Sequence, residues 1–222
     1  MNRLTHYLSQ PLLLILSCVL LSWSSLNHSA TAENQTHAIT SEKTVLVLGD
    51  SISAAFGFDQ SKGWVQLIAT KFQGNLNIIN ASISGDTTTG GRYRLPQALE
   101  THQADLVIIE LGGNDGLRGT PIPTIKANIA SMIQTAKNTG ATVLLMGMKI
   151  PPNYGERYTQ LFETVYRELA SEYDTLFIPF FLEGAIGLPD MMQADGIHPT
   201  EKAQPIMARW LEIKLNEWLA AF

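Results

Sequence analysis

Three residues in this sequence have the types and surroundings that nucleophilic catalysis requires. Ser51 ends a GDS block that begins with the last residue, Gly49, of the apolar run TVLVLG. His198 stands in DGIHPT, where Pro199 disfavours helical geometry at the histidine and Asp195 lies three positions earlier. A serine hydroxyl needs a base within reach, and a carboxylate on one ring nitrogen orients a histidine to act as that base. The set predicts acyl transfer, whereas the alternative for Asp195 and its neighbours is an ordinary turn.

Two further residues follow apolar runs and could bind negative charge. Asn114 stands in ELGGNDG and Gly85 stands in NASISGDTTTGG, each just beyond a predicted strand. A side-chain amide and an unobstructed backbone N–H are suitable donors to a developing oxyanion. Glycine-rich turns are the alternative explanation. A phosphate-binding loop is not supported, since neither G-x-x-x-x-G-K-[ST] nor G-x-G-x-x-G follows any of the predicted strands.

Predicted strands and helices alternate along the chain around these residues. Continuous apolar runs predict five strands covered on both faces, at 44–49, 76–80, 105–111, 142–148 and 175–179. Apolar residues of helical period lie between 64 and 72, 125 and 136, 161 and 169, and 206 and 218, with Thr200 placed to cap the last helix. This order predicts an α/β fold, a three-layer α/β/α sandwich around a five-stranded parallel sheet. Ligand chemistry in such sheets collects at the carboxyl ends of the strands.

The first 32 residues have the features of a secretory signal peptide. Arg3 precedes an eleven-residue apolar run (11–21), and the stretch ends in Ala-Thr-Ala at 30–32. The alternative is a membrane anchor, but the run is shorter than the ~20 residues that span a bilayer. We therefore expect a flexible lead-in at 33–43, a single domain at 44–222, and a periplasmic or secreted protein without a stable membrane anchor.

Composition narrows the classes of function further. Cleavage would remove Cys18, the only cysteine, which excludes a disulfide framework and thiolate catalysis in the mature chain. Loss of Arg3 would take the formal charge from −5 to −6, and an acidic domain without a basic run is a poor binder of nucleic acid. No convincing metal-ligand cluster is present, so we expect no metal and no cofactor. The expected partner is a small-molecule substrate, and the expected state is a monomer.

Taken together and in order, these blocks resemble the SGNH, or GDSL-type, hydrolase family. The family is recognised by serine in GDS, glycine in a second block, asparagine in G-x-N-D, and aspartate and histidine in D-x-x-H-P. The motifs NASISGDT, ELGGNDGLRG, PPNYG and DGIHP make the chain similar to the bacterial exported thioesterase, lysophospholipase and arylesterase subgroup. One departure is Ile52, where leucine is usual. The matching residues are Gly49-Asp50-Ser51, Gly85, Gly112-Gly113-Asn114-Asp115 and Asp195-Gly196-Ile197-His198-Pro199.

The resemblance implies a flavodoxin-like fold and a role for each matching residue. Ser51 would be the nucleophile, His198 the general base and then acid, and Asp195 the group that orients the histidine. The backbone N–H groups of Ser51 and Gly85 and the amide of Asn114 would form the oxyanion hole. The aspartates that neighbour site residues are interpreted as loop-stabilising; they are Asp50, Asp86 and Asp115.

The substrates implied by the subgroup are acyl thioesters, lysophospholipids and small aryl or alkyl esters. An acyl chain needs an apolar wall, which the segment KIPPNYGERY could supply through Ile150, Pro151 and Tyr154. The same three residues could instead only close a loop over the following helix. Two other functions stay open, a carbohydrate esterase or deacetylase of the same family and a non-catalytic acyl-binding domain.

Overall fold

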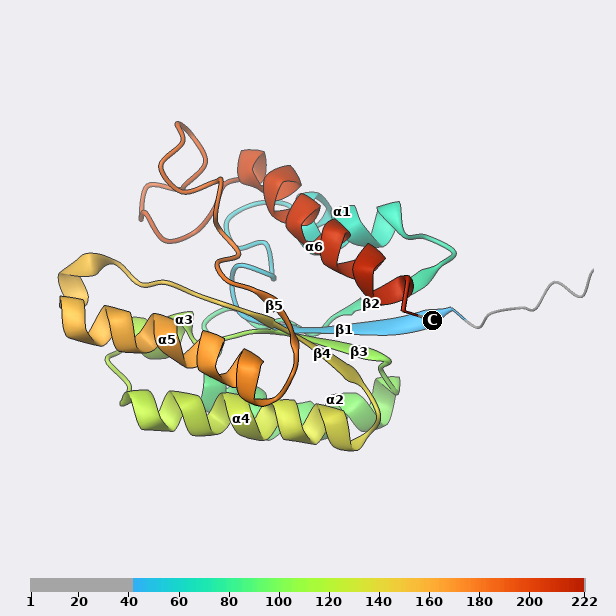
Figure 1. Ribbon diagram of the computed structural model, residues 1–222. Coiled ribbons are helices and arrows are strands. Elements are labelled where there is room, and N and C mark those ends of the chain that lie inside the picture. Colours follow the sequence, from blue (N-terminus) through green and yellow to red (C-terminus); the bar gives the residue numbers. More distant parts are fainter. Residues whose placement is uncertain (1–41, 222) are drawn as a thin grey trace, which may run out of the picture. The chain divides into compact units, whose positions relative to one another are not determined.

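The computed structural model describes residues 42–221, which form a five-stranded parallel sheet with helices on both faces (Figure 1). The strand order is β2-β1-β3-β4-β5, and each neighbouring pair is parallel. The strands are β1 (Lys43–Gly49), β2 (Leu76–Asn80), β3 (Leu106–Glu110), β4 (Thr142–Met146) and β5 (Leu176–Ile178). Residues 1–41, including the expected signal peptide, lie outside the described residues.

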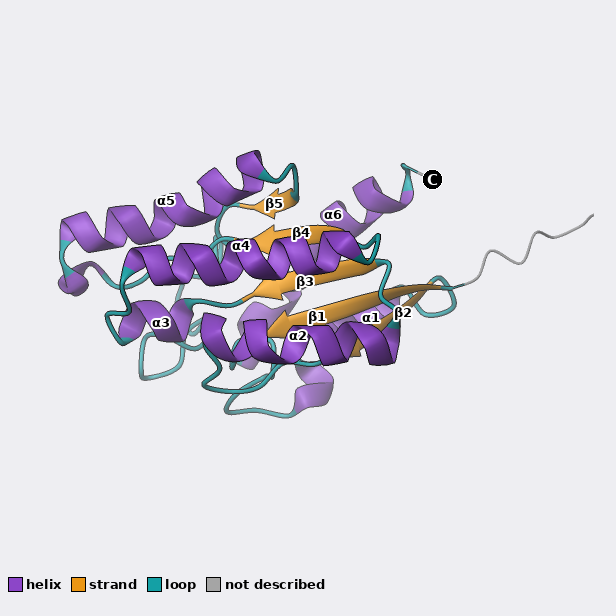
Figure 2. Ribbon diagram, turned by 90° about the horizontal axis from the view of Figure 1, so that it is seen from below, coloured by secondary structure: helices purple, strands orange, loops and turns teal. Residues whose placement is uncertain are grey.

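The helices form two layers, one on each face of the sheet. α1 and α6 pack together on one face, and α2, α4 and α5 cover the other (Figures 1 and 2). The helices are α1 (Trp64–Lys71), α2 (Thr88–His102), α3 (Gly113–Leu117), α4 (Ile122–Asn138), α5 (Glu156–Glu172) and α6 (Gln204–Leu219). Short 3₁₀ turns occupy Gln60–Lys62, Pro152–Tyr154 and Glu201–Ala203. The three-layer α/β/α prediction is confirmed.

The side chains of β1 show why the central strands carry continuous apolar runs. Leu46 and Leu48 belong to the hydrophobic cluster under α2, α4 and α5, whereas Val45 and Val47 belong to the cluster under α1 and α6. All four are fully buried. Because successive side chains of a strand point to opposite faces, a strand covered on both faces must be apolar at every position.

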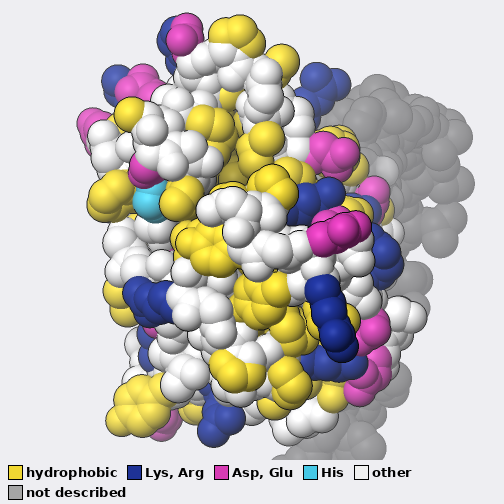
Figure 3. Space-filling model, turned by 90° about the vertical axis from the view of Figure 1, so that its left-hand side faces the viewer, with side chains coloured by type: hydrophobic (Ala, Val, Ile, Leu, Met, Phe, Trp, Pro, Cys, Tyr) yellow, Lys and Arg dark blue, Asp and Glu magenta, His cyan; other side chains and the backbone are white. Residues whose placement is uncertain are grey.

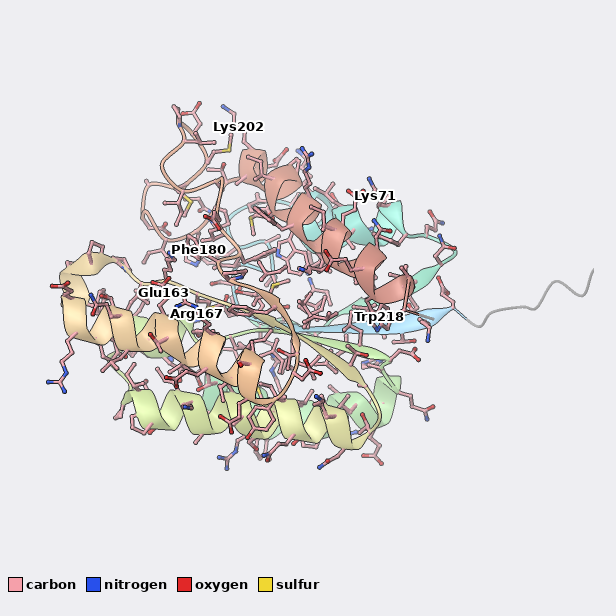
Figure 4. All side chains as sticks on the ribbon, in the orientation of Figure 1. Lys71, Glu163, Arg167, Phe180, Lys202 and Trp218 are labelled. Atoms are coloured by element: carbon pink, nitrogen blue, oxygen red, sulfur yellow. The ribbon has the colours of Figure 1, made fainter. Side chains whose placement is uncertain are left out.

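The beginning of α6 differs from the prediction that Thr200 caps it. The helix begins at Gln204 after a 3₁₀ turn, and the Thr200 hydroxyl donates to the backbone oxygen of Asp190 (2.6 Å). Pro205 follows in the first turn of α6, where its missing N–H costs no hydrogen bond. The Gln204 side chain instead accepts a hydrogen bond from the N–H of Trp64 (3.0 Å) and so satisfies the start of α1. Lys71 of α1 and Trp218 of α6 lie on the face of the sheet that these two helices cover (Figure 4).

Several element boundaries also differ from the predicted ranges. Lys43, placed in the lead-in from its sequence, belongs to β1 because it pairs with Leu76. β3, β4 and β5 are one or two residues shorter than predicted at one or both ends, and β3 gives way to Gly112, whose φ of +121° turns the chain away from the sheet. In the sequence only the end of α2 near His102 is recognisable, because two glycines and Pro96 weaken its helical signal. Among residues 42–221 no helix is long and apolar enough to cross a membrane.

The strand order locates the expected site within the fold. The chain passes from β1 to β2 on one side and then to β3 on the other side of β1. The order 2-1-3-4-5 is that of flavodoxin-like sheets, in which ligands bind beyond the carboxyl ends of the strands where the winding reverses. This point lies between β1 and β3, whose following residues include Ser51 and Asn114.

Candidate active site

Ser51 lies just beyond the end of β1 and is 7% exposed. Its Oγ is 2.9 Å from Nε2 of His198, a residue 147 positions further along the chain. The strand must end in glycine here, because a Cβ at Gly49 would lie 2.5 Å from Oγ of Ser53 and 2.7 Å from Oε2 of Glu110. The close packing of the end of β1 against Ser53 and Glu110 therefore restricts the backbone that carries Ser51.

The other ring nitrogen of His198 contacts Asp195. Nδ1 lies 2.7 Å from Oδ2 of the aspartate, and Oδ1 accepts the N–H groups of Ile197 (2.9 Å) and His198 (3.0 Å). Desolvation raises the pKa of Asp195, but the hydrogen bonds from His198 and Ile197 outweigh it and lower the pKa to about 2. The carboxylate therefore stays ionised at neutral pH and can hold the imidazole in one orientation.

Gln193 connects the loop that carries His198 to the loop that follows Ser51. Its backbone N–H donates to the oxygen of His198 (2.8 Å). Its side-chain amide donates to the backbone oxygens of Phe56 (2.7 Å) and Pro199 (3.1 Å). The Phe56 ring lies against the imidazole with ring centroids 4.5 Å apart. His198 is thus held from the backbone and from its ring face, and no sequence pattern points to the glutamine.

The three predicted oxyanion donors follow the three strands nearest to the serine. Asn114 lies in the first turn of α3, and its amide donates to Oδ2 of Asp50 (3.2 Å), which leaves the second amide hydrogen free. Gly85 lies in the turn after β2 with a φ of +81°, and its oxygen accepts a hydrogen bond from Arg118 (3.2 Å). Within residues 42–221 the N–H groups of Ser51 and Gly85 have no acceptor. Neither group is therefore committed to an internal hydrogen bond among these residues.

Asp115 and Asp50, predicted to stabilise loops, accept hydrogen bonds from loop residues. Asp115 accepts the N–H and the hydroxyl of Thr88, each at 2.7 Å, at the start of α2. Oδ1 of Asp50 accepts the N–H of Ile52 (3.0 Å), while its Oδ2 holds Asn114. Burial raises the pKa of Asp50 to about 6. Asp50 thus connects the segment after β1 to the segment after β3.

A second buried carboxyl group, Glu110, lies next to Asp50 and was missed in the sequence. Its Oε2 accepts the hydroxyl of Ser53 (2.6 Å) and the N–H of Asp50 (3.2 Å), while Oε1 has no partner among the described residues. Burial, and then the nearby Asp50 carboxylate, raise the pKa of Glu110 well above its usual range. An acid that closes an otherwise apolar strand was the available signal.

Replacing Glu110 with glutamine is expected to make the protein progressively more stable than the wild type as the pH rises. The folded wild type keeps the Glu110 proton at pH values where the unfolded chain has lost it, so its stability falls above the ordinary pKa of glutamate. That loss is at most about 1.4 kcal/mol per pH unit, and glutamine avoids it while keeping the acceptor oxygen. Urea unfolding between pH 4 and pH 8 measures the difference.

The control for this measurement is Glu100→Gln, on the exposed surface of α2. Its difference from the wild type should stay nearly constant with pH. A constant difference for Glu110→Gln as well would show that the buried group titrates with an ordinary pKa.

An apolar pocket with a volume of about 380 Å³ opens at the carboxyl ends of the strands. Ile150 and Pro151 lie in its wall, as do residues from the segments that carry Ser51, Asn114 and His198. Tyr154 is not among the wall residues, because a 3₁₀ turn carries it past the rim, where it is 38% exposed. The apolar wall residues are Ile52, Leu117, Met148, Ile150, Pro151, Pro152, Phe180, Phe181, Leu182, Ile186 and Ile197.

One cation contributes to the pocket wall. Lys149 forms an ion pair with Glu163 of α5 (3.0 Å), and its ammonium group lies over the ring of Phe180, 5.2 Å from the centroid. Figure 4 labels both of these partners at the same end of the sheet. Figure 3 shows this end of the molecule, where hydrophobic side chains gather beside a histidine. Across 42–221, no group of three or more His, Cys, Asp or Glu side chains is arranged to hold a metal ion.

Comparisons with known proteins identify the family of the chain and several of its relatives. The model of the GDSL-like Lipase/Acylhydrolase family matches residues 47–205, a span that includes Ser51, Asp195 and His198. Esterase TesA of Pseudomonas aeruginosa is 52% identical over 73% of this chain and 83% of its own. Thioesterase 1/protease 1/lysophospholipase L1 of Escherichia coli is 43% identical over 78% of this chain and 83% of its own.

A solved structure gives the same result for the fold. The psychrotrophic esterase EstA from Pseudoalteromonas sp., solved in a form inhibited by monoethylphosphonate, is 38% identical to this chain. The two superimpose with a TM-score of 0.77. The alignment covers 81% of this chain and 100% of the esterase. The family resemblance of the sequence blocks is therefore confirmed, and the chain belongs to the GDSL-like lipase/acylhydrolase family.

Proposed function

We propose that this chain is a serine hydrolase that cleaves carboxylic esters and thioesters of acyl chains. The observation that carries the proposal is the continuous contact from Ser51 Oγ through the His198 ring to Asp195, with distances of 2.9 and 2.7 Å. The names of the relatives, an esterase and a thioesterase/lysophospholipase, support the same reaction class. An acyl-binding domain without activity would have no need of this arrangement.

In the proposed reaction, His198 Nε2 takes the proton of Ser51 as Oγ attacks the carbonyl carbon of the substrate. The tetrahedral intermediate collapses as the histidine gives the proton to the departing alcohol or thiol, which leaves Ser51 acylated. Water then attacks the acyl-enzyme with the histidine again as base, and the acid is released. Asp195 stays ionised throughout and stabilises the imidazolium form.

The oxyanion of each intermediate would be bound by the N–H groups of Ser51 and Gly85 and the amide of Asn114. The two backbone donors have no acceptor within residues 42–221, so a ligand oxygen would not need to displace an internal hydrogen bond. Asp50 would aim the Asn114 amide through the hydrogen bond at 3.2 Å. Donors fixed in advance bind the developing charge more strongly than the ground-state carbonyl.

The apolar pocket would hold the acyl chain, with Ile150 and Pro151 as part of its wall. Acyl thioesters, lysophospholipids and aryl esters all present an apolar acyl chain of this kind. Residues 1–32 would act as a cleavable signal peptide, which would place the mature chain, with its single domain at 44–222, in the periplasm or outside the cell. The domain would work as a monomer. The small-molecule ester would be the only partner that the reaction requires.

The proposal predicts that truncating Ile186 weakens hydrolysis of long acyl esters more than short ones. Ile186 lies in the pocket wall and is 50% exposed, so Ile186→Ala removes apolar contact with a bound chain. A loss of roughly 1 kcal/mol would lower kcat/KM for p-nitrophenyl octanoate about fivefold and leave p-nitrophenyl acetate nearly unchanged. A series of p-nitrophenyl esters from two to twelve carbons, with a thioester and a lysophospholipid, measures the profile.

Leu161→Ala is the matched control, because Leu161 is 47% exposed on α5 and is not a wall residue. It should leave the chain-length profile unchanged. Equal losses for both esters in Ile186→Ala would contradict acyl binding in this pocket. Hydrolysis restricted to acetylated sugars would instead indicate a carbohydrate esterase.

A further inference from the structure

Arg94 of α2 connects the last residue of β1 to the segment that follows β2. Its Nε donates to Oδ2 of Asp86 (2.7 Å) and its Nη2 to the backbone oxygen of Gly49 (3.1 Å). Its Nη1 donates to the backbone oxygen of Ala81. The ion pair is largely buried, with side-chain exposures of 19% for the arginine and 11% for the aspartate. One guanidinium therefore holds three acceptors from two different segments.

These acceptors stand next to the two backbone donors of the proposed oxyanion hole. Gly49 lies two residues before Ser51, and Asp86 directly follows Gly85. The oxygen of Gly49 also accepts the N–H of Ile83 (3.1 Å). The loop after β2 is therefore hydrogen-bonded to the end of β1 at the same oxygen that Arg94 binds. The relative position of the two donor N–H groups thus depends on this junction.

The junction is built closely around the ion pair. Oδ1 of Asp86 accepts the N–H of Thr87 (2.8 Å) at the start of α2. A Cβ at Gly90 would lie 2.0 Å from the same oxygen, so only glycine admits the carboxylate here. Burying an arginine and an aspartate is costly unless both are fully hydrogen-bonded, and here the planar guanidinium matches its three acceptors.

We propose that Arg94, together with Asp86, is a positioning residue that sets the oxyanion donors of Ser51 and Gly85. The inference rests on the proposed function, since it assigns a positioning role to Arg94 in an oxyanion hole that acts only in ester cleavage. Arg94 would not touch the substrate. Its loss would leave ground-state binding in the apolar pocket intact and would misplace the donors that act in the transition state.

The test compares Arg94→Met and Arg94→Lys in the full chain with p-nitrophenyl butyrate as substrate. A displacement of the donors by a fraction of an ångström to 1 Å should lower kcat by about 10- to 100-fold in Arg94→Met, with KM changed less than about threefold. Lysine keeps the charge but lacks the planar fork with which the guanidinium reaches all three acceptors at once. The kcat of Arg94→Lys should therefore lie between those of the wild type and of Arg94→Met. Arg94→Lys carries the test if the methionine variant does not fold.

Two control variants on the same helix separate positioning from general destabilisation. Arg92→Met changes an exposed arginine whose bond goes to Asn128 (3.1 Å), and it should keep kcat within about threefold of the wild type. Leu99→Ala empties a buried position near the other end of α2 and should lower the melting temperature without a selective loss of kcat.

The inference is overturned if folded Arg94→Met keeps kcat within twofold of the wild type. It is also overturned if Leu99→Ala loses as much kcat at an equal fall in melting temperature, or if the loss in Arg94→Met appears mainly in KM. Failure of the proposed function would look different, because the wild type would then hydrolyse no ester or Ser51→Ala would stay active.

Discussion

Ser51→Ala is expected to abolish ester hydrolysis, with kcat lowered by at least about 10⁴-fold. The substitution removes the one oxygen that lies 2.9 Å from Nε2 of His198, and no other hydroxyl in the described residues contacts that nitrogen. The substitution removes only one oxygen atom, and Ser51 lies beyond the carboxyl end of β1, so the fold should persist. Hydrolysis of p-nitrophenyl butyrate and thermal unfolding, measured on the same preparation, separate the two effects.

Ser131→Ala is the control for this experiment. Ser131 lies on α4, away from the carboxyl ends of the strands, and its replacement should leave kcat unchanged. If Ser51→Ala retains more than about one per cent of wild-type turnover, another group supplies the nucleophile and the proposed mechanism is wrong.

Asp195→Asn is expected to lower kcat by about 10²- to 10⁴-fold with little change in KM. The asparagine oxygen can still accept the backbone N–H groups of Ile197 and His198, so the loop should keep its shape. Its amide, however, would present a donor to Nδ1 and favour the wrong tautomer of the imidazole. Because the pKa of Asp195 is about 2, acid should remove the carboxylate from the wild type only well below pH 4.

The control is Asp190→Asn in the same segment, where the carboxylate pairs with Lys202 on the surface (2.9 Å). That pair is exposed, and its loss should leave kcat nearly unchanged. Wild-type turnover in Asp195→Asn would instead assign the orienting role to another carboxylate. Asp50 would be the first to test, since it is buried beside the serine.

The sequence predicts the sheet well, for simple reasons. Apolar runs that are buried on both faces are readable without any tertiary information, and four of the five were nearly complete strands. The carboxyl-end rule predicts that residues following different strands gather at one end of the sheet, and the structure places Ser51 and His198, 147 positions apart, in contact.

The residues that the sequence does not reveal are those whose role depends on a distant partner. Arg94 looks like any arginine on a weakly helical segment, and only the fold brings Gly49 and Asp86 to it. Gln193 and Glu110 likewise depend on loops or strands that meet in three dimensions. Tyr154 is the reverse case, because its place in a motif suggested a pocket-wall residue. The 3₁₀ turn at Pro152–Tyr154 carries it beyond the residues that line the pocket.

If Ser51 is the activated nucleophile, a fluorophosphonate should label it. The probe forms a bond only with a serine that a base has made reactive. The full chain should acquire one adduct, located by peptide mass spectrometry on Ser51, and Ser51→Ala should acquire none. An adduct on a different residue, or an unlabelled Ser51 in protein that still hydrolyses esters, would contradict the account.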